Sequence, residues 1–173
     1  MTSSADIRLR AVEPEDLELL YAIENDAATW NYSSARGLYS RYTLRQYLAS
    51  SQSDIYADGQ LRMVAEMVDG DGEATALGLV DLTGFDALAL RAEVGIVLLP
   101  QMRCKGYGAA ILRELSVLAR HLCLHQLWAT IAVTNSVAEH TFSQAQFQPV
   151  ALLHHWLADE SGFVDARIWQ LML

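Results

Sequence analysis

The sequence predicts an α+β fold in which helices flank a mixed central sheet of about seven strands. Three stretches carry this prediction. The apolar run 92–99 stops at a proline, which is typical of a buried strand. An amphipathic helix follows it, with apolar residues at helical spacing over 111–122. Near the end of the chain, the segments 148–158 and 164–173 meet across a polar turn and predict two paired strands.

The N-terminal part of the chain predicts one strand and two helices. Residues 7–11 alternate in polarity as an edge strand does. Residues 13–16 read Glu-Pro-Glu-Asp and predict a helix start, because proline suits the first turn and acids suit the positive end of the helix dipole. The apolar stripe that follows ends near Asn25. A second, short helix is expected over 43–51, with Thr43 as its N-cap.

The middle of the chain predicts three consecutive strands. Residues 60–68 alternate between apolar and polar side chains, which indicates a half-buried strand. The sequence Asp-Gly-Asp-Gly at 69–72 is typical of a hairpin turn, and 74–85 supplies the partner strand. Residues 86–90 then lead into the central strand 92–99.

The last part of the chain adds a strand over 126–133, a helix opened by Thr134-Asn135-Ser136, and the final pair of strands. The element order is therefore strand, helix, helix, three strands, helix, strand, helix, two strands. No internal repeat, low-complexity tract or linker interrupts this order, so residues 1–173 are expected to form a single domain. A domain near this size buries roughly 70% of the surface that its unfolded chain exposes.

Composition argues against several classes of protein. The net charge is −9 and the pI is near 4.9, which disfavours nucleic acid as a partner. No stretch approaches the ~20 apolar residues that span a bilayer, and the N-terminus lacks the apolar core of a signal peptide. Cys104 and Cys123 lack the spacing of metal ligands, and two cysteines do not make a disulfide framework. We therefore expect a bacterial-type cytoplasmic enzyme without a metal. An acidic surface would favour a cationic substrate such as an amine, although an ordinary acidic surface explains the charge equally well.

The loop between the central strand and the amphipathic helix is basic and contains glycine. Glycines let the backbone approach a ligand closely, and the first N–H groups of a helix have no internal partner. Arg103 and Lys105 add positive charge, so the loop suits phosphate groups. It is not a Walker loop, because no Gly-Lys-Ser/Thr follows at the required spacing. Nor is it a dinucleotide fingerprint, because Gly106 and Gly108 lack a third glycine at the right offset.

The pattern Arg-x-x-Gly-x-Gly at 103–108 resembles the pyrophosphate loop of the GNAT acetyltransferases, Gln/Arg-x-x-Gly-x-Gly/Ala. The flanking strand and helix, and the later helix with Asn135 near its start, strengthen the likeness. It is closest to the branch of spermidine N-acetyltransferases and ribosomal-protein N-terminal acetyltransferases. It runs from about residue 91 to the C-terminus, and more loosely back to Ile7. The resemblance implies the GNAT fold, with a central strand that splays away from its neighbour.

The resemblance also implies how acetyl-CoA would be bound as co-substrate. The backbone of the central strand would bond the pantetheine arm, and the loop and the start of its helix would face the pyrophosphate. Asn135 would contact the cofactor arm, or would serve as a helix N-cap, or both. The residues expected to bind the cofactor are Ile96, Val97, Leu98, Arg103, Cys104, Lys105, Gly106, Tyr107, Gly108, Ala109 and Asn135.

The catalytic residues depart from the family pattern. A tyrosine often protonates the leaving thiolate in this family, and the matching position here is Phe142, which has no proton to give. An acid of that kind is worth ~10²–10⁴ in rate. Glu93 is the leading candidate for the base: it begins the strand expected to carry the cofactor, and the resemblance implies a glutamate there that can act through water, although most glutamates are merely solvated. His140, His154 and His155 are rivals, and the last two, adjacent on a strand, would put one imidazole toward the substrate or the core.

The acceptor side is expected to lie near Trp30 and Tyr32, since this segment forms the acceptor wall in the family. Aromatic rings can cradle an ammonium group, although they can equally be core. Polyamine acetyltransferases place carboxylates here, whereas this chain reads Asn-Tyr-Ser-Ser-Ala-Arg-Gly over 31–37. That departure counts against a doubly charged acceptor.

These observations predict an N-acyltransferase that moves an acetyl group directly from acetyl-CoA to a primary amine. A protein N-terminus or a small amine is the expected acceptor. Three alternatives stay open: a polyamine acetyltransferase, a catalytically weak acyl-CoA-binding or regulatory module, and a general nucleotide-binding domain, the last disfavoured by the absent Walker pair. The family branch also suggests a homodimer, and the apolar strands at the end of the chain could pair with another subunit.

Overall fold

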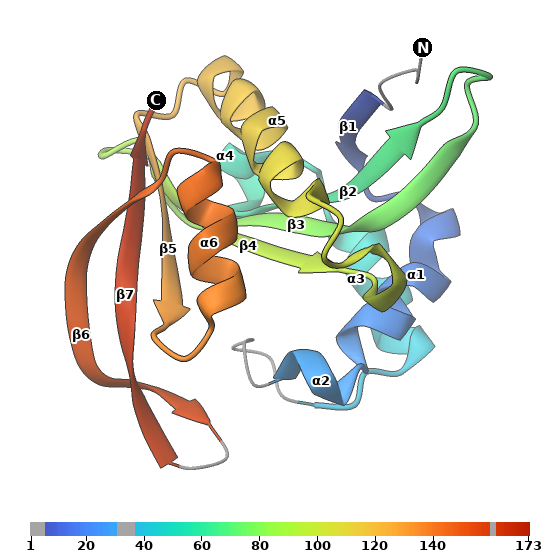
Figure 1. The fold of residues 1–173 in the computed structure, drawn as a ribbon. Coiled ribbons are helices and arrows are strands. Elements are labelled where there is room, and N and C mark those ends of the chain that lie inside the picture. The colour runs from blue at the N-terminus through green and yellow to red at the C-terminus, as the bar shows by residue number, and fades with distance from the viewer. Residues whose placement is uncertain (1–5, 31–36, 160–161) are drawn as a thin grey trace.

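A computed structural model describes residues 6–30, 37–159 and 162–173. It contains a seven-stranded sheet with the order β1-β2-β3-β4-β5-β7-β6, flanked by helices (Figure 1). Only β4 and β5 run parallel, and the other neighbours are antiparallel. The predicted α+β fold with a mixed sheet is therefore confirmed. The strands are β1 (Asp6–Ala11), β2 (Leu61–Val68), β3 (Ala74–Asp86), β4 (Arg91–Leu98), β5 (Gln126–Ala132), β6 (Gln148–Asp159) and β7 (Gly162–Met172).

Helices cover both faces of the sheet. On one face, α5 and α6 pack over β2 to β5 and enclose the larger core cluster, in which Leu112, Leu127 and Phe147 are fully buried. On the other face, α1 and α3 pack over β2 and β3 around Leu20 and Val64. The helices are η1 (Pro14–Asp16), α1 (Leu17–Glu24), α2 (Ala27–Trp30), α3 (Arg41–Ser50), α4 (Ile55–Asp58), η2 (Pro100–Met102), α5 (Tyr107–His121) and α6 (Ser136–Gln144). No helix in the described segments is both long and apolar enough to cross a membrane.

The start of α3 differs from the prediction. The helix begins at Arg41, and Ser40 is its N-cap, because the Ser40 hydroxyl accepts a hydrogen bond from the Thr43 amide at 3.1 Å. Thr43 therefore lies inside the first turn, and the prediction that it caps the helix was wrong. Both residues are good N-caps in isolation, and the extended backbone of Ser40 decides between them. The single-turn helices α2 and α4 were not predicted, since four residues are too few to show a helical period.

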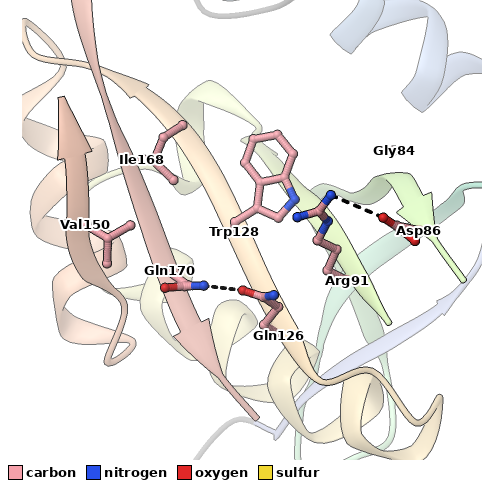
Figure 2. A pocket seen from close by; sticks show the side chains of 8 residues that line it. All are labelled: Gly84, Asp86, Arg91, Gln126, Trp128, Val150, Ile168 and Gln170. Carbon is pink, nitrogen blue, oxygen red and sulfur yellow. Dashed lines mark hydrogen bonds and ion pairs between the residues drawn. The ribbon is translucent and has the colours of Figure 1, made fainter. Parts of the chain in front are cut away.

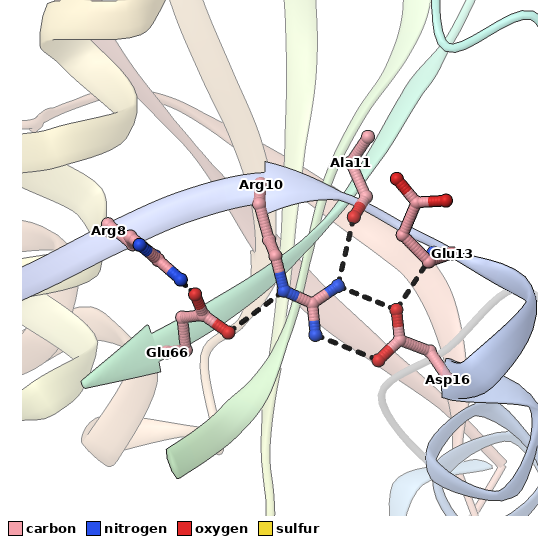
Figure 3. A network of polar contacts seen from close by, with 6 residues as sticks. All are labelled: Arg8, Arg10, Ala11, Glu13, Asp16 and Glu66. Carbon is pink, nitrogen blue, oxygen red and sulfur yellow. Dashed lines mark hydrogen bonds and ion pairs between the residues drawn. The ribbon is translucent and has the colours of Figure 1, made fainter. Parts of the chain in front are cut away.

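Buried charges fasten the first strand to the helix that follows it (Figure 3). The Glu66 carboxylate is buried and accepts hydrogen bonds from the guanidinium groups of Arg8 and Arg10. Arg10 also donates to both oxygens of Asp16, at 2.7 and 2.9 Å. Burial opposes the ionisation of Glu66, but the two arginines outweigh it and lower its pKa. The hydrogen bonds from Arg10 likewise lower the pKa of Asp16. The network thus fixes β1 against β2 and against η1.

The end of α6 is held in a left-handed turn by a residue that is not glycine. Gln146 has φ of 72°, and the Phe147 amide donates to the Phe142 carbonyl at 3.1 Å, which closes the helix end. A side chain in this left-handed conformation is strained.

We expect Gln146→Gly to raise the free energy of unfolding by about 0.5–1 kcal/mol, since relief of the strain exceeds the greater backbone entropy of glycine. Urea denaturation measures the change. The matched control is Gln144→Gly, two residues earlier and at the last helical position of α6, which should lower stability instead. A Gln146→Gly protein less stable than the wild type would contradict the strain at this turn.

Candidate active site

The strands β4 and β5 separate part of the way along their length. They pair at Arg91 with Gln126, at Ala92 with Leu127 and at Glu93 with Trp128, and no further pair joins them in the described part of the chain. β4 continues beside β3 as far as Leu98. Figure 1 shows the two strands diverging. The β5-facing edge of β4 beyond Glu93 therefore presents backbone groups without a strand partner.

The ladder with β3 decides which residues of β4 face this opening. The Leu99 amide donates to the Leu77 carbonyl, so the alternation of an antiparallel ladder turns the backbone of Val97 toward β3. By the same alternation, the backbone groups of Ile96 and Leu98 point toward β5. Of the three strand residues expected to bond the cofactor, two thus face the opening and Val97 faces away.

The loop before α5 presents a group of free amides. Cys104 and Gly106 have φ of 58° and 82°, and Gly106 caps α5 without a side-chain hydrogen bond. Alternation of left-handed and ordinary residues turns successive N–H groups toward one side, which makes an anion-binding concavity. Within the described residues, the amides of Tyr107, Gly108 and Ala109 have no hydrogen-bond partner, and Ala110 begins the helical pattern by donating to Gly106. This arrangement suits a phosphate group.

Arg103 and Lys105 differ in their surroundings. The Arg103 Nε donates to the Leu98 carbonyl at 3.0 Å, and its Nη2 lies 3.7 Å from the Asp26 carboxylate. The guanidinium therefore ties the loop to the end of β4 and to the segment after α1. Lys105 is exposed beside the free amides. Sequence reasoning assigned both residues to the pyrophosphate and missed the anchoring contacts of Arg103, which join residues far apart in the chain.

Close packing brings α6 to the start of α5. A Cβ atom on Gly108 would lie 2.8 Å from Thr141 Cγ2, so the absence of a side chain at Gly108 allows the approach. Asn135 caps α6, and its Oδ1 accepts a hydrogen bond from the Ala138 amide at 3.1 Å. The expected N-cap is confirmed, while its contact with a cofactor stays a prediction. Phe142 is buried and packs edge-on against Phe147, with ring centroids 4.9 Å apart. The position of the family's acid is thus a core position here.

Glu93 lies at the point where the strands part. Its carboxylate accepts a hydrogen bond from the Thr130 hydroxyl at 3.0 Å. If β4 and β5 stayed paired, the Thr130 amide would bond the β4 backbone, but their last pair is Glu93 with Trp128. Burial raises the pKa of Glu93 above its usual value, and the weaker effect of hydrogen bonding from Thr130 lowers it. A half-buried carboxylate with a raised pKa suits a general base.

The rival histidines are all exposed. His140 is exposed on α6. His154 and His155 are both exposed on β6, so neither of the pair packs in the core. The reason is a break in the strand alternation: the register shifts between Leu153 and Leu157, and His155 has φ of 51°.

The aromatic side chains expected to form the acceptor wall lie outside the described part of the chain. Tyr32 lies outside the described residues. Trp30 ends α2, and its side chain is also outside the described part. No group of three or more His, Cys, Asp and Glu side chains suited to a metal ion occurs among the described residues.

A hollow that sequence reasoning missed lies on the sheet around Trp128, the β5 partner of Glu93 (Figure 2). Its volume is about 390 Å³. The cross-strand register places Trp128 next to Glu93 on one side and next to Gln170 on the other. The alternation of Gln126, Trp128 and Thr130 with buried residues of β5 is the signal that could have found it. The lining residues are Gly84, Asp86, Arg91, Gln126, Trp128, Val150, Ile168 and Gln170.

Comparisons with known proteins agree with this geometry. The family description "Acetyltransferase (GNAT) domain" matches residues 6–148. The spermidine N-acetyltransferase of Vibrio cholerae in complex with CoA and spermine is 20% identical, with a TM-score of 0.82 over 96% of this chain and 95% of that one. A dodecameric structure of the spermidine N-acetyltransferase from the same organism is also 20% identical, with a TM-score of 0.78 over 96% and 93% of the two chains. No curated protein sequence matches.

The chain belongs to the GNAT acetyltransferase family. It is therefore an acyltransferase by family, built on the GNAT fold, and its family uses acetyl-CoA. The similarity to the Vibrio cholerae structures shows the fold that they share.

Proposed function

We propose that this protein transfers an acetyl group from acetyl-CoA directly to a primary amine. The observation that carries the proposal is the place of Glu93, at the last β4–β5 pair, between the strand opening and the hollow. A thioester lying in the opening and an amine entering from the hollow would meet at this carboxylate. Holding the two reactants together in this way needs no covalent intermediate on the protein.

The chain supplies suitable contacts for acetyl-CoA. Backbone groups of Ile96 and Leu98 face the opening, the free amides at the start of α5 suit the pyrophosphate, and Lys105 adds a positive charge. When bound, acetyl-CoA supplies the acetyl group as a thioester. In the overall reaction a C–N bond forms, a C–S bond breaks, and the amine gives up its proton.

Glu93 would receive that proton, directly or through one water. An amine with a pKa near 10.4 is mostly protonated at neutral pH, so a positioned carboxylate assists by drawing the proton away. Phe142 cannot protonate the leaving sulfur. A thiol has a pKa of about 8.5, so its departure as thiolate near neutral pH costs only one to two pKa units. Transfer without the tyrosine is therefore slower and still feasible.

A second candidate is a catalytically weak acyl-CoA-binding module. The observation that favours it is the burial of Phe142 at the position of the family's acid. It differs from the first in predicting CoA binding without turnover.

One experiment separates the two candidates. Purified protein is mixed with acetyl-CoA and a panel of amines, amino acids and N-terminal peptides; free thiol is followed with a thiol-reactive dye, and products are identified by mass spectrometry. CoA affinity is measured in parallel by calorimetry. We expect thiol release that depends on the amine, with a product heavier by one acetyl group. CoA binding with no release from any amine would overturn the transferase and favour the module.

A further inference from the structure

We propose that the acceptor is a monoamine whose uncharged body lies in the hollow over Trp128, and that a second cationic group is rejected there. This inference rests on the proposed function, because it names the substrate class for the same site. Three features carry it: the register position of Glu93 next to Trp128 of the hollow, the lining of the hollow, and its charges.

The hollow begins within one strand spacing of the proposed base. Glu93, Trp128 and Gln170 form one row across β4, β5 and β7, and neighbouring strands lie about 4.8 Å apart. All three side chains lie on the face opposite α5 and α6, since the alternating residues Ala92, Leu127 and Trp169 belong to the core on the other face. If the amine of the acceptor lies at Glu93, the carbon atoms that follow the amine therefore lie against Trp128. At about 390 Å³, the hollow has room for a body of several heavy atoms.

Apart from the Asp86–Arg91 pair, the described lining of the hollow is uncharged. Trp128 is half-buried and provides an indole surface, and Ile168 and Val150 add aliphatic surface farther from Glu93. The Gln126 and Gln170 amides hydrogen-bond to each other across the strands (Figure 2). Such a wall favours an aromatic or aliphatic group, which gains by burial against the indole.

The charges of the hollow disfavour a second ammonium group. In the described part of the chain, the hollow is lined by one carboxylate, that of Asp86, whose Oδ2 lies 3.2 Å from Arg91 Nη2 in an ion pair. The Arg91 side chain is the more exposed partner, at 50% against 36%, so a second cation would meet the guanidinium first. On the other side of Glu93, the carboxylates of Asp81 and Glu24 are both engaged by Arg62, at 2.7 and 2.6 Å. Recognition of a diamine needs a carboxylate available to the second charge.

The test uses two amines that differ by one charge. Hexylamine and 1,6-diaminohexane have the same chain length, and 2-phenylethylamine adds an aromatic body. With acetyl-CoA saturating, we expect kcat/KM for hexylamine to exceed that for the diamine by about tenfold or more, the size of effect that one unfavourable charge contact produces. Trp128→Ala should raise KM for 2-phenylethylamine by about tenfold, with CoA affinity unchanged.

A substitution should reverse the preference. Arg91→Ala leaves Asp86 available, so activity toward 1,6-diaminohexane should rise by about tenfold relative to hexylamine. Arg120→Ala, an exposed arginine near the end of α5 on the other face, is the matched control and should leave the ratio unchanged. If the Trp128→Ala protein does not fold, Trp128→Leu is used in its place. The comparison of the two hexyl amines with the Arg91→Ala protein does not depend on either Trp128 variant.

The outcomes distinguish this inference from the proposed function. Equal activity toward the two hexyl amines, with no effect of Arg91→Ala, would overturn the monoamine assignment and leave the transferase intact. Preference of the wild type for the diamine would also overturn the monoamine assignment, would leave the transferase intact, and would point to a polyamine acceptor. Absence of transfer to every amine, with CoA bound, would overturn both.

Discussion

Glu93→Gln is expected to lower kcat by about 10²–10⁴-fold, the usual contribution of a positioned general base. Glutamine keeps the shape of the side chain and can still accept a hydrogen bond from Thr130, so CoA affinity and stability should change little. Steady-state kinetics with the best acceptor measures the effect, and calorimetry checks the CoA affinity. Glu114→Gln, an exposed glutamate on α5, is the matched control and should keep full activity. Undiminished kcat in the Glu93→Gln protein would show that this carboxylate is not the base.

The pH dependence of activity in the wild type, in Glu93→Gln and in Thr130→Val identifies the titrating group. Because Glu93 acts in its ionised form, activity should fall as the pH drops through its pKa, which burial raises above the usual value. Thr130→Val removes a hydrogen bond that lowers this pKa, so the acidic limb of the kcat/KM profile should move to higher pH. In Glu93→Gln the limb should disappear. An acidic limb that persists unchanged in both variants would assign the titration to another group.

Gly78→Ala should destabilise the protein and weaken CoA binding together. A Cβ atom at this position would lie 2.1 Å from the Val97 carbonyl oxygen and 2.8 Å from Leu98 Cα, both of them backbone atoms of β4. The strand cannot yield without moving the end that lies beside the phosphate loop. We expect the free energy of unfolding to fall by about 1–3 kcal/mol, as for other overpacked sites, or by more.

Thermal denaturation and CoA calorimetry measure the two effects of Gly78→Ala. The control for stability is Gly95→Ala, where a Cβ atom would lie 3.6 Å from Asp81 Cβ, an ordinary contact. That variant should be far less destabilised. Wild-type stability and CoA affinity in Gly78→Ala would mean that β3 and β4 are less tightly apposed than the structure has them.

The long periodic segments of this fold could be predicted from sequence, and the short or interrupted ones could not. The hairpin turn at 69–72 forms as expected, because Asp-Gly sequences specify a local geometry: the Gly72 amide donates to the Asp69 carbonyl. The break in β6 at His155 has no such local signal, so adjacent histidines were assigned to opposite faces. Alternation predicts orientation only while a strand stays regular.

In the candidate site, too, the residues of one continuous motif could be predicted from the sequence, and the contacts between separate strands could not. The phosphate loop is a continuous motif, so its residues could be found together. The hollow is assembled from β3, β4, β5, β6 and β7, and its Asp86–Arg91 and Gln126–Gln170 contacts depend on strand register. The contact between Glu93 and Thr130 exists because β4 and β5 part at that residue, and only the register locates the parting. Glu93 itself could be singled out, whereas its partners could not.

The form of β6 has a consequence for behaviour at high protein concentration. An edge strand is a template on which further strands of other molecules can grow, and here Val150, Leu152 and Trp156 are exposed along it. The register of β6 shifts twice, between Pro149 and Ala151 and between Leu153 and Leu157. A regular strand from another molecule can therefore pair with only a short part of β6 before the two strands lose their hydrogen-bond register. We therefore expect the irregular register of β6 to disfavour fibrous growth along this edge of the sheet.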